Sequence, residues 1–70
     1  MKGVFLIILN GTKITYIAGQ TLAQLILKQN ITTQNIVAEI NGVIIHHNQF
    51  TSTLLHANDR IELITFVGGG

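Results

Sequence analysis

Apolar and polar residues alternate in short runs along most of the chain, a pattern that is typical of β-strands. Two Asn-Gly dipeptides, Asn10-Gly11 and Asn41-Gly42, each separate two such runs. Because both residues readily adopt positive φ, each dipeptide predicts a tight hairpin. The strand-like runs are residues 4–9, 12–17, 36–40, 43–47 and 60–67.

One segment has a helical pattern instead. Apolar residues stand at i, i+3 and i+4, as Leu22, Leu25 and Ile26, and Thr21 is followed three positions later by a glutamine. This arrangement is a capping box before an amphipathic stripe. We therefore expect a helix over residues 21–29 that buries its stripe against one face of a mixed sheet.

The segment between the last two strands is less regular. We expect a single helical turn around residues 48–50, and we expect Leu54 and Leu55 to anchor the following stretch to the core. Asp59 ends the turn "HAND", where its carboxylate can accept hydrogen bonds from nearby backbone N–H groups.

Size and composition exclude several classes of protein. Seventy residues make one small domain, and the absence of cysteine excludes a disulfide framework and a thiolate metal site. The net charge is only +1 and the cations are scattered, so no nucleic-acid interface is indicated. The longest apolar run is far short of the ~20 residues that span a bilayer.

The candidate catalytic side chains form no recognisable constellation. His46 and His47 are adjacent on an expected strand, so their side chains should face opposite ways. His56 lies near a turn, and neither Glu39 nor Glu62 has a partner at a spacing that suggests general acid–base work. We expect Glu62 to face solvent, and we expect neither a bound cofactor, nor a metal, nor enzymatic activity.

The chain ends with three glycines, Gly68, Gly69 and Gly70. An extended tripeptide reaches about 10 Å, and residues without a Cβ can thread a narrow channel in a partner. The last carboxylate would then be an unhindered group that a partner enzyme could activate with ATP. We expect residues 1–67 to form the domain and residues 68–70 to form a flexible tail.

Taken together, these segments resemble the ThiS-like sulfur carriers of thiamine biosynthesis. The resemblance rests on the opening strand that ends in "NG", on "AGQTLAQLI", "VAEINGVII" and "HANDRIELITFV", and on the terminal "GG". It covers essentially the whole chain. It implies an α+β, ubiquitin-like β-grasp fold with four to five strands and one crossover helix.

The resemblance also implies a chemistry. In such carriers an E1-like adenylyltransferase uses ATP to convert the C-terminal carboxylate into an acyl-adenylate, and sulfur from a cysteine-desulfurase relay then replaces AMP. The resulting thiocarboxylate supplies sulfur to thiazole synthase. On this chain Gly70 would carry the reactive carboxyl group and Gly69 would be its required neighbour, while Gly68 extends the usual pair to three.

Recognition by such partners requires a surface. Ile64 and Phe66 share a face of the last strand with Arg60 and Glu62, directly before the tail. We therefore expect Ile64 and Phe66 to form an exposed apolar patch, with Val67 beside them at the start of the tail. The opposite assignment, with Phe66 in the core and Val67 exposed, remains open.

Three other functions remain open. They are a molybdopterin-type sulfur carrier, a ubiquitin-like modifier conjugated through Gly70, and a β-grasp binding module whose tail is inert. We expect a monomer in the cytoplasm, or in a plastid stroma if the gene is in an organelle. The many Ile, Asn, Thr and Gln residues are typical of an AT-rich genome.

Overall fold

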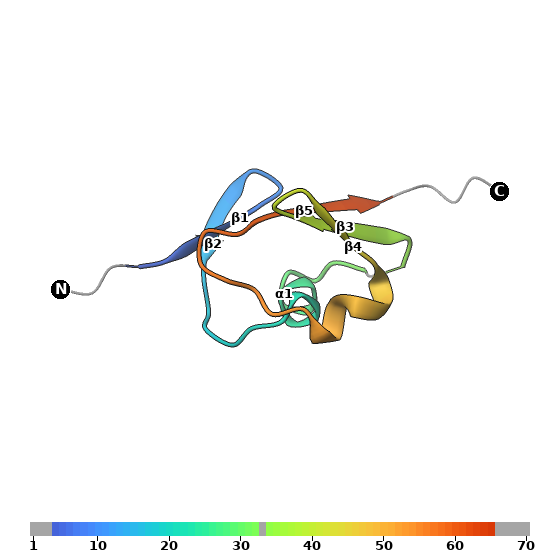
Figure 1. The fold of residues 1–70 in the computed structure, drawn as a ribbon, viewed down its shortest axis with the longest axis horizontal. Helices are drawn as coiled ribbons and strands as arrows, with labels where there is room; N and C mark the ends of the chain where they lie inside the picture. Colours follow the sequence, from blue (N-terminus) through green and yellow to red (C-terminus); the bar gives the residue numbers. More distant parts are fainter. Residues whose placement is uncertain (1–3, 33, 66–70) are drawn as a thin grey trace.

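The fold is a five-stranded mixed sheet with one α-helix and one 3₁₀ helix on the same side of it (Figure 1). The structure is a computed structural model that describes residues 4–32 and 34–65. The elements in chain order are β1 (Leu6–Leu9), β2 (Thr12–Thr15), α1 (Leu22–Lys28), β3 (Ile36–Ile40), β4 (Val43–Ile45), the 3₁₀ helix η1 (His47–Ser52) and β5 (Arg60–Thr65).

The strand order is β2-β1-β5-β3-β4, so the last strand is the central one. β5 pairs in parallel with β1 and antiparallel with β3, while β1–β2 and β3–β4 are antiparallel hairpins. This arrangement confirms the predicted α+β, ubiquitin-like β-grasp fold. The predicted boundary between domain and tail, at residues 67 and 68, lies outside the described residues.

Both predicted hairpin turns are present. Asn10 and Gly11 have φ of 49° and 84°, and Asn41 and Gly42 have φ of 52° and 87°. Two consecutive residues at positive φ make the turn whose twist matches that of the flanking strands. The strands of the first hairpin, Leu6–Leu9 and Thr12–Thr15, are shorter than predicted, although the Tyr16 N–H still donates a hydrogen bond to the Phe5 carbonyl at 2.8 Å.

The capping box starts α1 as the sequence predicts. Thr21 Oγ1 accepts a hydrogen bond from the Gln24 N–H at 3.1 Å, and Gln24 Oε1 accepts one from the Thr21 N–H at 2.8 Å. The helix ends before Asn30, which has a φ of 59°. Thr21 and Gln29 are thus the caps of the helix and lie outside its regular part.

The predicted strand over residues 43–47 is too long. β4 ends at Ile45, and His47 already belongs to η1, so the inference that His46 and His47 face opposite sides of a strand is wrong. The chain turns here because Gln49 bonds back to His46: Gln49 Oε1 accepts from the His46 N–H at 3.0 Å, and the Gln49 N–H donates to the His46 carbonyl at 2.8 Å. This turn carries Phe50 into the core.

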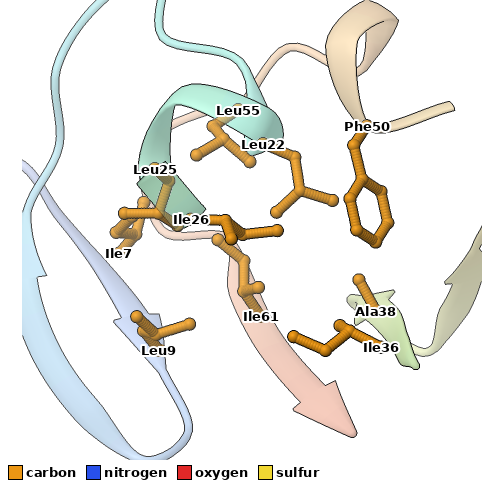
Figure 2. Packing of buried hydrophobic residues seen from close by; sticks show 10 residues of the cluster. All are labelled: Ile7, Leu9, Leu22, Leu25, Ile26, Ile36, Ala38, Phe50, Leu55 and Ile61. Atoms are coloured by element: carbon orange, nitrogen blue, oxygen red, sulfur yellow. The ribbon is translucent and has the colours of Figure 1, made fainter. Parts of the chain in front are cut away.

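One apolar core fills the space between α1, η1 and the sheet (Figure 2). Leu55 is buried there, but Leu54 is 53% exposed, so only one of these two leucines anchors the segment as predicted. Leu54 forms an isolated β-bridge with Thr21, and in such a bridge neighbouring side chains point in opposite directions. The ten buried residues of the core are Ile7, Leu9, Leu22, Leu25, Ile26, Ile36, Ala38, Phe50, Leu55 and Ile61.

Candidate functional site

β5 is the strand that leads into the glycine tail. β3 pairs with it from Ile40 opposite Ile61 to Ile36 opposite Thr65, whereas β1 accompanies it only at Arg60 and Ile61. The second half of β5 therefore extends beyond the end of β1, as Figure 1 shows. The predicted tail Gly68–Gly70 and the predicted patch residues Phe66 and Val67 lie outside the described residues.

Side chains of the two hairpin asparagines hold β5 from both sides. Asn41 Oδ1 accepts a hydrogen bond from the Arg60 N–H at 2.9 Å, and Asn10 Oδ1 accepts one from the Leu63 N–H at 2.8 Å. Each asparagine thus combines the positive φ of its turn with a contact to the central strand. The dipeptide pattern predicted the turns, but a contact across 53 positions leaves no local signal in the sequence.

Asp59 fixes the point at which β5 starts. Its carboxylate is buried, and it accepts hydrogen bonds from the His56 N–H at 2.8 Å and from Asn41 Nδ2 at 2.9 Å. The first bond confirms the predicted turn role of this residue. The second joins the turn before β5 to the β3–β4 turn, a connection that sequence reasoning missed because it needs the strand order.

The two faces of the sheet differ. Ile61 is buried beneath α1 and Leu63 packs against the same core, while Arg60, Glu62 and Ile64 point the other way. Residues opposite one another in the register share a side of the sheet. The surface turned away from the helix, here called the outer face, therefore comprises Leu6, Ile8, Lys13, Thr15, Val37, Glu39, Ile44, Arg60, Glu62 and Ile64.

On the half of the outer face nearest the tail, apolar side chains lie next to two carboxylates. Ile64 lies opposite Val37, and Glu39 lies between Glu62 on β5 and Ile44 on β4. Ile64 is 42% exposed and Ile44 is 48% exposed. The predicted exposure of Ile64 and Glu62 is confirmed, and the role of Ile64 as a partner contact stays a prediction.

Sequence reasoning missed the other members of this surface. Val37, Glu39 and Ile44 come next to Ile64 and Glu62 through pairings between β3 and β5 and between β3 and β4. Alternation within "RIELITFV" indicates which residues of one strand share a face. It does not indicate which strand lies alongside.

The titratable side chains of the described residues lie mostly apart from one another. No three His, Cys, Asp or Glu side chains within residues 4–32 and 34–65 come close enough to hold a metal ion. His56 Nδ1 lies 4.0 Å from Asp59 Oδ2, but the Asp59 carboxylate already binds backbone and amide donors, and His56 is largely exposed. His47 stacks at a tilt on Phe50. In the described part of the chain no helix has the length and apolar character needed to cross a bilayer.

Comparison with known proteins gives relatives and a solved structure. An uncharacterized protein ycf40 of Porphyra purpurea is 37% identical over 41 residues, and the ycf40 protein of Pyropia yezoensis is 34% identical over the same length. Each of these matches covers 59% of this chain and 58% of the relative, so the chain spans little more than half the length of the curated relatives it matches.

The fold has a counterpart of known structure. The thiamine biosynthesis protein ThiS from Geobacter metallireducens superposes with a TM-score of 0.74, covering 93% of this chain and 99% of that one at 22% identity. At this identity the likeness concerns the fold alone. The family model "ThiS family" matches residues 7–70, from the second residue of β1 to the last glycine. The chain therefore belongs to the ThiS family.

Proposed function

We propose that this chain is a sulfur carrier whose Gly70 carboxylate is adenylated and then converted to a thiocarboxylate, which donates sulfur for thiazole formation in thiamine biosynthesis. The family match from residue 7 to Gly70 carries the proposal, because it extends through the tail that would do the work. The central position of β5 supports it, since the residues before the tail belong to the strand that joins the two halves of the sheet.

The chemistry places the reactive group on the main chain. The Gly70 carboxylate would attack the α-phosphorus of ATP and release pyrophosphate, which makes the carbonyl carbon electrophilic and gives it AMP as a leaving group. The outer sulfur of a persulfide from a cysteine-desulfurase relay would then attack the carbonyl carbon and displace AMP. A thiol would reduce the resulting acyl disulfide, releasing the thiocarboxylate and leaving a disulfide on the relay. No side chain of the carrier takes part in any step of this proposal.

The catalytic groups in this proposal belong to partners. An E1-like adenylyltransferase binds the ATP, activates Gly70 and recognises the carrier through the apolar patch of Ile64, Phe66 and Val67. Thiazole synthase receives the sulfur. The exposure of Ile64 on the outer face supports this use of the patch, because an exposed apolar cluster beside a tail is typical of a protein interface.

Intact mass spectrometry tests the proposed charging of the tail. The full chain is incubated with ATP, the adenylyltransferase of the same organism and a sulfur source. We expect a mass increase equal to the exchange of one oxygen for sulfur, located on Gly70 by fragmentation. A variant without Gly69 and Gly70 is the control and should not change in mass. The proposal is contradicted if the full chain stays unmodified although the same enzyme preparation charges another carrier protein.

A copurification experiment tests the choice of acceptor. The family name and the name of the similar structure both favour thiamine biosynthesis. We expect thiazole synthase to copurify with the carrier. Copurification with the large subunit of a molybdopterin synthase instead would keep the tail chemistry but replace the acceptor, and a stable adduct on lysines of other proteins would indicate a modifier.

We also propose that the carrier is encoded and used in a plastid. The ycf40 relatives in Porphyra purpurea and Pyropia yezoensis support this, because both come from plastid genomes of red algae. Immunodetection in isolated plastids, compared with the remaining cell fraction, tests the location. Enrichment outside the plastids contradicts it.

A further inference from the structure

The two Asn-Gly turns share their backbone geometry and their exposure. In Asn10-Gly11 and in Asn41-Gly42 both residues have positive φ and are exposed. The backbone N–H of Asn10 donates to the Ile61 carbonyl of β5 at 2.9 Å. The backbone N–H of Asn41 donates in the same way to the Arg60 carbonyl of β5 at 2.8 Å. The turns therefore form a matched pair for comparing the surroundings of one dipeptide.

An exposed Asn-Gly pair can modify itself in water. The glycine nitrogen attacks the side-chain carbonyl carbon Cγ of the asparagine, the Cγ–Nδ2 bond breaks, and Nδ2 leaves as ammonia with the proton of the attacking nitrogen. Glycine favours the attack because it has no Cβ to hinder the approach. Water then opens the cyclic imide: opening at Cγ gives aspartate, and opening at the main-chain carbonyl gives isoaspartate. Water is the only co-reactant.

The side-chain oxygens of the two asparagines are held in the same way. The Leu63 N–H donates to Asn10 Oδ1 at 2.8 Å. The Arg60 N–H donates to Asn41 Oδ1 at 2.9 Å. A donor aimed at this oxygen stabilises the negative charge that forms on it when Cγ is attacked. The side-chain oxygens therefore give no reason for the two sites to react differently.

The side-chain nitrogens differ. Asn41 Nδ2 donates to Asp59 Oδ1 at 2.9 Å, and this buried carboxylate is also held in place by the His56 N–H. Within residues 4–32 and 34–65, no hydrogen bond holds Asn10 Nδ2. Because Nδ2 is the group that must leave, the reaction at Asn41 breaks a hydrogen bond to a carboxylate, which is among the stronger kinds in proteins. The reaction at Asn10 breaks no such bond.

We propose that Asn10 is a site of spontaneous deamidation in the folded protein, and that Asp59 protects Asn41 from the same reaction. The inference goes beyond the proposed function and does not rest on it. It gives the Asp59 carboxylate a second role besides fixing the start of β5.

Peptide mapping by mass spectrometry tests the proposal on the full, folded chain. The protein is kept at mildly alkaline pH, where the glycine nitrogen loses its proton more readily, and the conversion of amide to acid is followed at both sites. The same measurement in urea gives the ratio of rates that the preceding residues, Leu9 and Ile40, set by themselves. In the folded chain the ratio should favour Asn10 by a further factor of about 10–100, which corresponds to one hydrogen bond to a charged group.

Asp59→Asn tests the protecting group. The single side-chain oxygen of this variant can accept from the His56 N–H or from Asn41 Nδ2 but not from both, so the rate at Asn41 should rise toward that at Asn10. The matched control is Thr21→Ala, which should destabilise the domain to a similar extent through the cap of α1. Since global unfolding exposes both sites alike, this control should leave the ratio of the two rates unchanged.

The two products at Asn10 should affect β5 differently. Aspartate keeps an oxygen that can accept from the Leu63 N–H, so its Tm should match that of the unreacted chain. Isoaspartate adds a methylene group to the main chain of a two-residue turn, which cannot then close in its present form. After chromatographic separation, the isoaspartate form should melt about 4–8 °C lower.

Two results would overturn the proposal. One is equal rates at Asn10 and Asn41 in the folded chain after correction by the ratio in urea. The other is a folded chain in which neither site reacts although both react in urea, because the turns would then protect both asparagines without Asp59. Charging of Gly70 is measured separately, as an exchange of oxygen for sulfur on the last residue, so neither result affects the proposed function.

Discussion

The side-chain oxygen Oδ1 of Asn10 accepts a hydrogen bond from the backbone N–H of Leu63 at 2.8 Å, although the two residues are 53 positions apart. β1 ends at Leu9, so it offers no backbone acceptor for the Leu63 N–H, and the Asn10 side chain provides the acceptor instead. Asn10 itself is the first residue of the β1–β2 turn, with a φ of 49°. The backbone of Asn10 thus closes the hairpin, and its side chain continues the hydrogen bonding of β5 beyond the end of β1.

Substitutions at Asn10 should separate these two roles. Asn10→Gly keeps the positive φ and loses the acceptor, so we expect a loss of about 0.5–1.5 kcal/mol in the free energy of unfolding. Asn10→Ala loses both, and the strain of positive φ adds about 1–2 kcal/mol. Asn10→Asp keeps both and should stay close to the unmodified chain. Urea unfolding measures the stability of all three variants.

Hydrogen exchange at the Leu63 amide provides the local control. Exchange should accelerate in Asn10→Gly and Asn10→Ala more than their global destabilisation accounts for, and it should stay slow in Asn10→Asp. Equal loss of stability in the Asp and Ala variants would show that the acceptor oxygen has no role.

Asp59 should be the carboxylate on which the fold depends most. Asp59→Ala leaves the His56 N–H and Asn41 Nδ2 without their acceptor, and we expect a loss of about 2–3 kcal/mol. Asp59→Asn should lose about half as much, because its single oxygen satisfies one of the two donors. The matched control is Glu62→Gln, which removes the same charge from the exposed face and should not destabilise the domain. Urea unfolding at neutral pH compares the three variants.

The capping box should matter more than usual because α1 has only seven residues. Thr21→Ala removes the acceptor for the Gln24 N–H, so we expect a loss of about 1 kcal/mol. Thr21→Ser keeps the hydroxyl group and should lose little. A circular-dichroism thermal melt distinguishes the two, and equal Tm values for the Ala and Ser variants would contradict a capping role.

Two leucines of α1 should differ greatly in what they contribute. Leu25 is buried between the helix and the sheet, and Leu25→Ala should lower the free energy of unfolding by about 2–5 kcal/mol. Leu27 is 77% exposed, and Leu27→Ala should change it by less than about 0.5 kcal/mol. Because a domain this small has little stability to spare, the Leu25 variant should be partly unfolded near 37 °C.

Features that depend on neighbours in the sequence were predictable. The Asn-Gly turns, the capping box and the stripe of Leu22, Leu25 and Ile26 all follow from local backbone preferences and helical spacing. The pattern of strands and helix predicted a small mixed sheet crossed by one helix, the family resemblance implied the β-grasp fold, and the structure confirms both.

Features that depend on distant pairing were not predictable. Glu39 and Glu62 face one another because β3 and β5 pair in that register, and no local pattern in the sequence indicates the register. The strand predicted at His46 and His47 was wrong for a different reason: the apolar run Val43–Ile45 leads straight into the two histidines, but Gln49 Oε1 accepts a hydrogen bond from the His46 N–H and the chain turns. Two local hydrogen bonds between His46 and Gln49 and the burial of Phe50 outweighed the strand preference there.

The apolar patch before the tail can be tested apart from the charges of the outer face. Ile64→Asp places a charge where Ile64 is 42% exposed, so it should weaken binding to the adenylyltransferase at least tenfold while the domain stays folded. The control is Leu27→Asp, a similar change on the exposed side of α1, which should leave binding unchanged. Isothermal titration calorimetry measures both affinities, and circular dichroism checks the fold.

Phe66→Asp applies the same test two positions further along the chain. If Phe66 shares the side of Ile64, both variants should stay folded and lose affinity, and the double variant should lose more than either. If Phe66 belongs to the core instead, its variant should unfold while Ile64→Asp remains folded. A folded Phe66→Asp carrier that binds the enzyme normally would remove Phe66 from the patch, and the same result for Ile64→Asp would remove the patch altogether. The two positions thus decide between an interface formed by one face of β5 and a tail that the enzyme recognises alone.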